Sequence, residues 1–225
     1  MNPINQFYSI QEAKKKAHFV IVIVHGGHEH YQLPSTRMQQ TYRFFIDAGA
    51  DAVINHHQHC YSGYEYYKNK PIFYGLGNFC FDEEPVLIGQ PYNFGYVVLL
   101  TLKKDKVDFV LFPYEQCSER AVVHGLPEDS FEKQINELNS IIADNEKLAY
   151  EELRYYESTY STIGSVLNSN KTRVVRFINR LFFPSTLFSK DYLLRLYNLL
   201  LCESHRDRVL SFLVSKYKSL QENEC

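Results

Sequence analysis

The sequence predicts an α/β domain followed by an all-α C-terminal extension. The first observation is a βαβ pattern near the N-terminus, in which two short apolar runs flank an amphipathic helical pattern. The second is a series of aromatic and β-branched runs, ending near Tyr114, that indicates β-hairpins. The third is a change at Pro127, after which helical periodicity dominates. We therefore expect an α/β domain over residues 1–126 and a helical region over residues 127–225.

The βαβ pattern begins with the run HFVIVIV from His18 to Val24, which is typical of a strand buried on both faces. Pro34-Ser35 supplies a helix start, apolar residues then recur at helical spacing, and Gly49 ends the helix. A second strand is expected from Ala52 to Asn55. Because a crossover of this length joins parallel strands, the C-terminal ends of both strands should lie at one edge of the sheet.

Later segments add a hairpin from YSGYEYY and PIFYG, and a second one from FGYVVLLTL and KVDFVLFPY. The sheet is therefore expected to be mixed. A long amphipathic helix is predicted from Asp129 to about Glu157. Three further helices are expected over Val174 to Phe183, Asp191 to Cys202 and Arg206 to Leu220.

Composition excludes several classes of protein. The 225 residues carry 24 basic and 26 acidic side chains, so no general electrostatic attraction to nucleic acid is expected. Five widely spaced cysteines favour neither a disulfide framework nor a cysteine zinc site. No signal peptide and no long uncharged apolar run are recognised, which favours a cytoplasmic location. The basic stretch with Arg173, Arg176 and Arg180 is expected to pack on the acidic helix rather than on a membrane.

Histidines cluster where the two predicted parallel strands end. Six of the nine follow these strands: His25, His28, His30, His56, His57 and His59. Ligands of open α/β sheets bind beyond the C-terminal ends of strands, so both clusters should meet there. Converging imidazoles without thiolates suit a divalent metal ion, namely zinc, manganese or iron. Glu29 and Asn78 supply oxygen donors that would serve as ligands or support them.

Three ordered motifs carry a family resemblance. VIVIVHGGHEH, FFIDAGADAVINHHQH and GYEYYKNKPIFYGLGNFCFD together resemble the bacterial capsule biosynthesis CapA family, linked to poly-gamma-glutamate synthesis. The resemblance covers about Phe19 to Asp82 and implies the fold of the calcineurin-type metallophosphoesterases. The α/β domain would then be the C-terminal half of a metallophosphoesterase-like mixed β-sandwich with flanking helices.

The resemblance also implies roles for individual residues. His25 matches the first histidine of the family pattern and Glu29 its glutamate, while His57 and His59 match the H-x-H of metallophosphoesterases. His56 is a competing register for the first of these two. Glu65, Asn78 and Asp82 fall on the later motif. In a metal-dependent hydrolysis of this kind, His28 or His30 would act as the proton donor. Arg37, at the start of the crossover helix, would either contact an anionic substrate or be a solvated helix residue.

The chain departs from the family pattern at several positions. Gly26 replaces a tryptophan, Asn55 a glycine, Gln58 a proline and Gly75 a serine. The pattern also has upstream G-D, N-x-E and N-N-H motifs that supply further metal ligands, and these have no counterpart here. We expect Met1 to be an internal methionine of a longer reading frame.

The predicted function is production of capsule, poly-gamma-glutamate or a related extracellular polymer, with divalent-metal-dependent hydrolysis in the full-length form. The alternative is a non-catalytic component of a polymer-synthesis assembly that retains a residual metal site. An anionic polymer or a phosphorylated small molecule is the expected ligand. Neither nucleic acid nor a membrane surface is expected as a partner.

Overall fold

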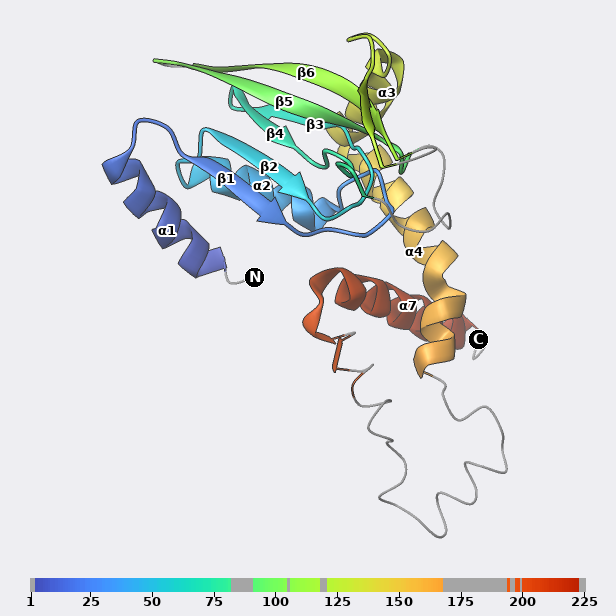
Figure 1. Cartoon of the computed structure of the whole chain (residues 1–225). Coiled ribbons are helices and arrows are strands. Elements are labelled where there is room, and N and C mark those ends of the chain that lie inside the picture. Colours follow the sequence, from blue (N-terminus) through green and yellow to red (C-terminus); the bar gives the residue numbers. More distant parts are fainter. Residues whose placement is uncertain are drawn as a thin grey trace. The chain divides into compact units, whose positions relative to one another are not determined.

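The structure is a computed structural model that describes residues 3–81, 91–104, 106–117, 121–167, 194, 197–198 and 200–222. The chain divides into two compact units, Met1–Glu152 and Leu153–Cys225. The first unit contains both sheets and the histidine loops (Figure 1).

A four-stranded sheet forms the centre of the first unit. Its strands are β1 (Ile21–His25), β2 (Ala52–His56), β3 (Tyr64–Tyr67) and β4 (Lys70–Phe73), arranged in the order β1-β2-β4-β3. β1, β2 and β4 are parallel to their neighbours, whereas β3 runs antiparallel to β4. The predicted parallel pairing of the first two strands and the predicted first hairpin are both confirmed.

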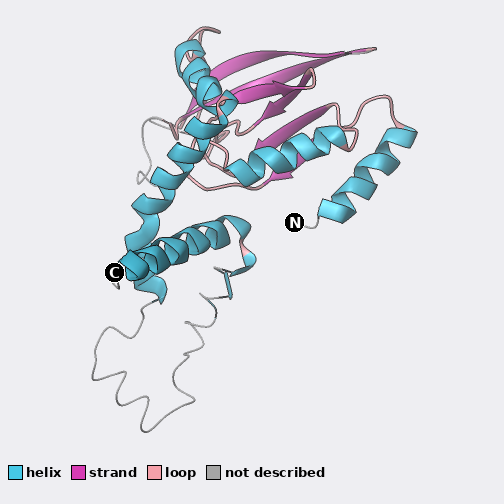
Figure 2. Cartoon of the chain, turned by 180° about the vertical axis from the view of Figure 1, so that it is seen from behind, coloured by secondary structure: helices cyan, strands magenta, loops and turns pink. Residues whose placement is uncertain are grey.

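One face of this sheet is covered by the crossover helix α2 (Thr36–Asp47), which lies in front of the strands in Figure 2. Ser35 caps this helix, because its side chain accepts a hydrogen bond from the main-chain N–H of Met38 at 3.1 Å. Tyr42 and Phe45 of α2 are buried in one hydrophobic cluster with residues of β1, β2 and β4. This apolar face confirms the helix predicted between the two strands.

The helix α1 (Pro3–Lys16) was not predicted from the sequence. It packs beside α2, with the rings of Phe7 and Phe44 stacked at 6.1 Å between centroids. Lys14 anchors its last turn through a 2.7 Å ion pair with Asp51.

A second, three-stranded sheet packs on the other face of the first. It contains β5 (Phe94–Lys103), β6 (Lys106–Gln116) and β7 (Val123–Gly125), all antiparallel. Phe109 of β6 joins the two sheets, because its ring lies 4.8 Å from that of Phe73 and 5.0 Å from that of Tyr64. The strands therefore form two separate sheets, of which the first is mixed and the second antiparallel.

Two helices replace the single long helix that the sequence predicted from Asp129 to Glu157. They are α3 (Glu132–Ala143) and α4 (Asn145–Leu167), separated at Asp144. Asp144 adopts an extended backbone, and its carboxylate accepts hydrogen bonds from the main-chain N–H groups of Glu146 and Lys147, both at 3.1 Å. The Asp144 carboxylate caps a new helix, so the helix is interrupted there although the apolar periodicity of the sequence continues.

The first unit contains helical residues as well as the two sheets. The residue before α3 and residues of α3 and the start of α4 are buried in the cores of the first unit: Phe131, Ile135, Ile142 and Leu148. The first unit therefore includes the helical segment up to Glu152.

The second unit pairs the end of α4 with α7 (Glu203–Glu222). The hydroxyl groups of Tyr160 and Ser211 lie 2.8 Å apart, and the ring of Tyr160 lies 5.5 Å from that of Phe212. α7 contains the helix predicted from Arg206 to Leu220. The predicted helix over Val174 to Phe183, with its arginines, lies outside the described residues. Within the described part of the chain, no helix combines the length and the apolar character needed to cross a membrane.

Candidate functional site

The two histidine loops meet at the C-terminal edge of the central sheet. His25, the last residue of β1, pairs with His56, the last residue of β2. The N–H of Gly26 then donates to the carbonyl of His56 at 3.4 Å, so the two segments remain hydrogen-bonded just beyond the end of β1. This convergence was predicted from the parallel crossover, and the register of β1 and β2 confirms it.

The rings of His25 and His57 are in direct contact. Nε2 of His25 lies 2.9 Å from Nδ1 of His57, which is hydrogen-bond distance when one of the two nitrogens carries the proton. On the far side of the ring, Nε2 of His57 lies 3.8 Å from a carboxylate oxygen of Glu29. The His57 ring thus connects the end of β1 with the loop that follows it.

His56 differs from His57 in its surroundings. Burial lowers the pKa of His56, and the nearby imidazole of His25 lowers it further. His56 remains a candidate ligand, although the ring that contacts His25 directly is that of His57.

His59 is tied to the loop after β4. Its Nδ1 lies 2.9 Å from the amide oxygen of Asn78, and the Asn78 amide donates back to the carbonyl of His59 at 3.2 Å. The neighbouring Gly77 lets the loop after β4 lie against the start of β5, because it has a φ of 89° and a Cβ there would lie 2.6 Å from the carbonyl oxygen of Phe94. With Nδ1 engaged, Nε2 is the nitrogen of His59 that remains to face a ligand.

The two predicted proton donors differ in exposure. His28 is 2% exposed, with its ring 6.4 Å from that of Tyr31. His30 is exposed and lies close to other rings of the site, 5.7 Å from His59 and 5.3 Å from Tyr92. A proton donor must reach the substrate, which favours His30 over His28. Arg37 lies in the first turn of α2, and Asp82 of the later motif lies outside the described residues.

The donor atoms suit a divalent metal in kind, because they are imidazole nitrogens with carboxylate and amide oxygens nearby. The number of donors that are grouped together, however, is lower than such a metal site usually has. Within the described residues, no three His, Cys, Asp or Glu side chains are grouped so that they would hold one ion. The site therefore offers a two-histidine contact with further donors around it.

A buried polar network beneath the histidines was missed in the sequence. Asn55 is fully buried, and its amide oxygen accepts from the N–H of Gly26 at 3.2 Å and from the hydroxyl of Tyr42 at 2.8 Å. Its amide nitrogen donates to the carbonyl of Tyr74 at 2.8 Å. Asn55 thus joins β1, α2 and the end of β4 directly below His25 and His56. An asparagine in an otherwise apolar strand was the available signal.

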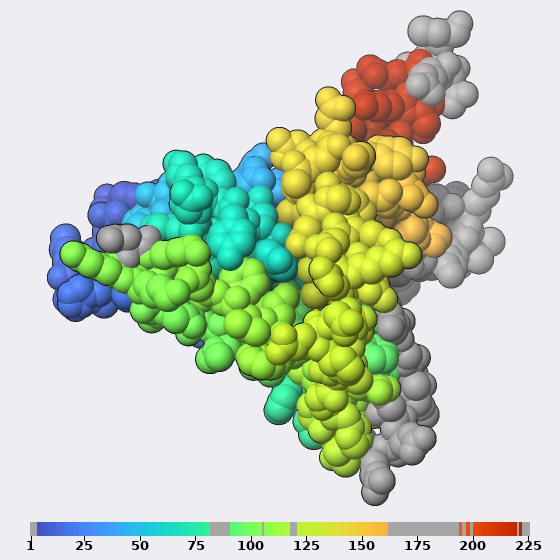
Figure 3. Space-filling view, turned by 90° about the horizontal axis from the view of Figure 1, so that it is seen from above, coloured from blue at the N-terminus to red at the C-terminus, as the bar shows by residue number. Residues whose placement is uncertain are grey.

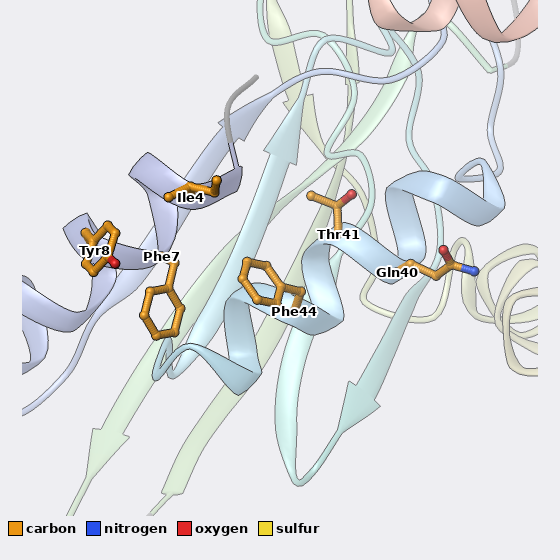
Figure 4. A pocket seen from close by; sticks show the side chains of 6 residues that line it. All are labelled: Ile4, Phe7, Tyr8, Gln40, Thr41 and Phe44. Carbon is orange, nitrogen blue, oxygen red and sulfur yellow. The ribbon is translucent and has the colours of Figure 1, made fainter.

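Two apolar surfaces lie outside the histidine loops. A cavity of about 600 Å³ opens between α1 and α2, lined by Ile4, Phe7, Tyr8, Gln40, Thr41 and Phe44 (Figure 4). The outer face of β5 and β6, seen from above in Figure 3, exposes the cross-strand pairs Val97 with Phe112 and Leu99 with Val110. No residue of either surface belongs to the histidine site.

The fold and the site define the class of protein: an α/β domain whose histidines lie at the C-terminal ends of parallel strands. Comparison with known proteins then shows a similarity over part of the chain. Residues 7–83 match the family described as bacterial capsule synthesis protein PGA_cap. The similarity covers this segment and part of the family's domain.

Two relatives illustrate the match. A stretch of 74 residues is 46% identical to the PGA biosynthesis protein CapA of Bacillus subtilis and covers 33% of this chain and 20% of that protein. A stretch of 87 residues is 39% identical to the capsule biosynthesis protein CapA of Bacillus anthracis, covering 37% of this chain and 21% of that protein. The chain thus spans about a fifth of the length of these relatives.

Proposed function

We propose that this chain acts in the production of capsule, poly-gamma-glutamate or a related extracellular polymer, and that its histidine loops bind a divalent metal ion. The family match supports the first part, because the matched segment contains every residue of the two histidine loops. The single observation that supports the second part is the 2.9 Å contact between His25 and His57 at the ends of adjacent parallel strands.

His25 and His57 are the proposed primary ligands, with Glu29, His56, His59 and Asn78 as the surrounding donors. A divalent ion held there would polarise a phosphoryl or acyl oxygen and lower the pKa of water. Asn78 orients the ring of His59, as partners of metal-binding histidines commonly do. His30, exposed at the rim, is the residue proposed to pass a proton to the leaving group.

The finer proposal is that the domain forms part of a metallophosphoesterase-like fold whose complete form hydrolyses a phosphorylated compound or an anionic polymer. The second candidate is a non-catalytic component of a polymer-synthesis assembly. It is favoured by the number of grouped donors, which is too small for a two-metal site within the described residues. Under either proposal, this chain alone should show little hydrolysis of a generic phosphodiester with added Mn²⁺.

Metal binding is tested on the purified protein by titration with Zn²⁺ and Mn²⁺ in a calorimeter. The double variant His25→Ala, His57→Ala should lose binding, whereas His124→Ala, on exposed β7, should retain it. Equal binding by the double variant and the wild type would refute the proposed site. Binding should also weaken below about pH 6.5, because protonated imidazole is not a ligand.

The biological role is tested in the organism that carries the gene. Deletion should lower the amount of extracellular polymer, and the wild-type gene should restore it. Restoration by a gene carrying His25→Ala and His57→Ala would leave the polymer role standing and refute the need for the histidine pair. Robust metal-dependent turnover by the isolated chain would refute the expectation that it shows little hydrolysis by itself, and would exclude the purely non-catalytic role.

A further inference from the structure

Gln58 lies between His57 and His59 in the loop after β2, and its side chain is directed into the protein. The residue is 1% exposed. Its Nε2 donates to the carbonyl of Tyr31 at 2.8 Å and to that of Leu33 at 3.2 Å. Its main-chain carbonyl accepts from the N–H of His30 at 2.8 Å. Each of these three bonds reaches the loop after β1, so Gln58 ties one histidine loop to the other.

The orientation of the Gln58 amide follows from these bonds. Because Nε2 donates to two carbonyls, Oε1 must point the other way. It is buried there without a hydrogen-bond partner among the described residues, and it lies against Gly75. A Cβ at position 75 would overlap Oε1 of Gln58, and would also lie 3.1 Å from the carbonyl of Cys60 and 3.2 Å from Cβ of Ser62. Gly75 therefore leaves the space that the Gln58 amide occupies.

The backbone around Gln58 is in a conformation that needs support. His30, His57 and His59 have φ values of 60°, 105° and 55°. Residues other than glycine adopt positive φ at an energetic cost, and they do so where the surrounding structure holds them. Gln58 is bonded to His30 through its main chain and is the sequence neighbour of both other histidines, so it is placed to supply that support.

We propose that Gln58 is a positioning residue of the histidine site, and that Gly75 is required for it to act. The buried amide holds the loop of His30 at a fixed distance from His57 and His59. The proposal rests on the proposed function only for what the site binds, because the bonds of Gln58 join protein atoms alone.

The test uses three single variants and one double variant of the whole chain. Gln58→Ala removes the amide, Gln58→Glu keeps its size but cannot donate to the two carbonyls, and Gly75→Ala displaces the amide from the other side. The double variant Gln58→Ala, Gly75→Ala removes both the amide and the overlap. The matched controls are Gln40→Ala at an exposed glutamine and Gly125→Ala at a glycine whose Cβ would meet nothing within 4 Å.

The first measurement is the ¹H–¹⁵N spectrum of the histidine rings in metal-free protein. Gln58→Ala, Gln58→Glu and Gly75→Ala should each shift the ring signals of His30 and His59, while both controls leave them in place. The second measurement is Zn²⁺ affinity, which should fall about 10-fold or more in each of the three variants, as for other residues that orient metal ligands. The double variant should bind no more weakly than Gln58→Ala, because the overlap no longer exists.

Unchanged ring signals of His30 and His59 in folded Gln58→Ala and Gln58→Glu would overturn the positioning role. Additive losses in the double variant would overturn the coupling to Gly75. If Gln58→Ala does not fold, Gln58→Glu and Gly75→Ala decide the question, since each keeps a side chain of the original size at position 58. If wild-type protein binds no Zn²⁺ while the ring signals shift as expected, the proposed metal site is refuted and the positioning role stands.

Discussion

Glu65 of β3 is expected to be one of the strongest single contributors to the stability of the first unit. Its carboxylate accepts from Nε of Arg43 at 2.9 Å and from Nη2 at 2.6 Å. It also accepts from the hydroxyl of Tyr74 at 2.6 Å. The hydrogen bond to Glu65 raises the pKa of Arg43, and burial raises the pKa of Tyr74 well above its usual value. The perturbation is Glu65→Ala.

The expected loss of stability follows from the groups that lose their partner when Glu65 is removed. Breaking a buried ion pair by removing one partner costs about 3–5 kcal/mol, and the lower value applies because the Arg43 side chain keeps 26% of its surface exposed. The buried hydroxyl of Tyr74 loses its acceptor as well, which adds about 1 kcal/mol. We expect the free energy of unfolding to fall by about 4 kcal/mol. The double variant Arg43→Leu, Glu65→Leu should recover about half of this loss, because no charge then remains unpaired.

The assay is urea unfolding followed by far-ultraviolet circular dichroism, since the chain contains no tryptophan. Lys68→Ala is the control, because it breaks an ion pair with Asp47 whose side chains are 63% and 39% exposed, and no measurable loss is expected. A loss below about 1 kcal/mol for Glu65→Ala would place the pair among exposed ion pairs and refute the reasoning.

Three further predictions concern other parts of the first unit. Ser35→Ala removes the cap of α2 and should lower stability by about 1 kcal/mol, as measured by the same unfolding assay. Alkylation by iodoacetamide near pH 8, followed by mass spectrometry, should label exposed Cys80 and spare Cys60, because burial raises the Cys60 pKa to about 12; early labelling of Cys60 would contradict this. Burial opposes ionisation of Asp51, but bonds from Lys14, the N–H of Val20 and Lys70 outweigh it and lower the pKa. The stabilisation by ionised Asp51 is present above the unfolded pKa near 4 and is lost as the pH falls through the folded value. Asp51→Asn should therefore be less stable than the wild type at pH 7, and its free energy of unfolding should fall less on acidification.

Local patterns in the sequence were sufficient for the central βαβ unit. The β-branched run before Gly26, the cap at Ser35 and the glycine after α2 each report a local preference of the backbone. Because a crossover of this length makes the strands parallel, the sequence also predicted that the two histidine loops meet. The break at Asp144 was missed because an apolar face with helical spacing continues across it.

Pairings between distant segments were decided only by the tertiary structure. The sequence predicted that His25, His57 and His59 come together, but it did not predict that the rings of His25 and His57 would be in direct contact. Gln58 and Gly75 read as unrelated departures from a family pattern, yet one fills the space that the other leaves. Periodicity reports whether a position is buried, but the side chain that fills a given space depends on how close-packed segments meet. For that reason the composition of the histidine site follows from the sequence, and its geometry from the packing of the loops.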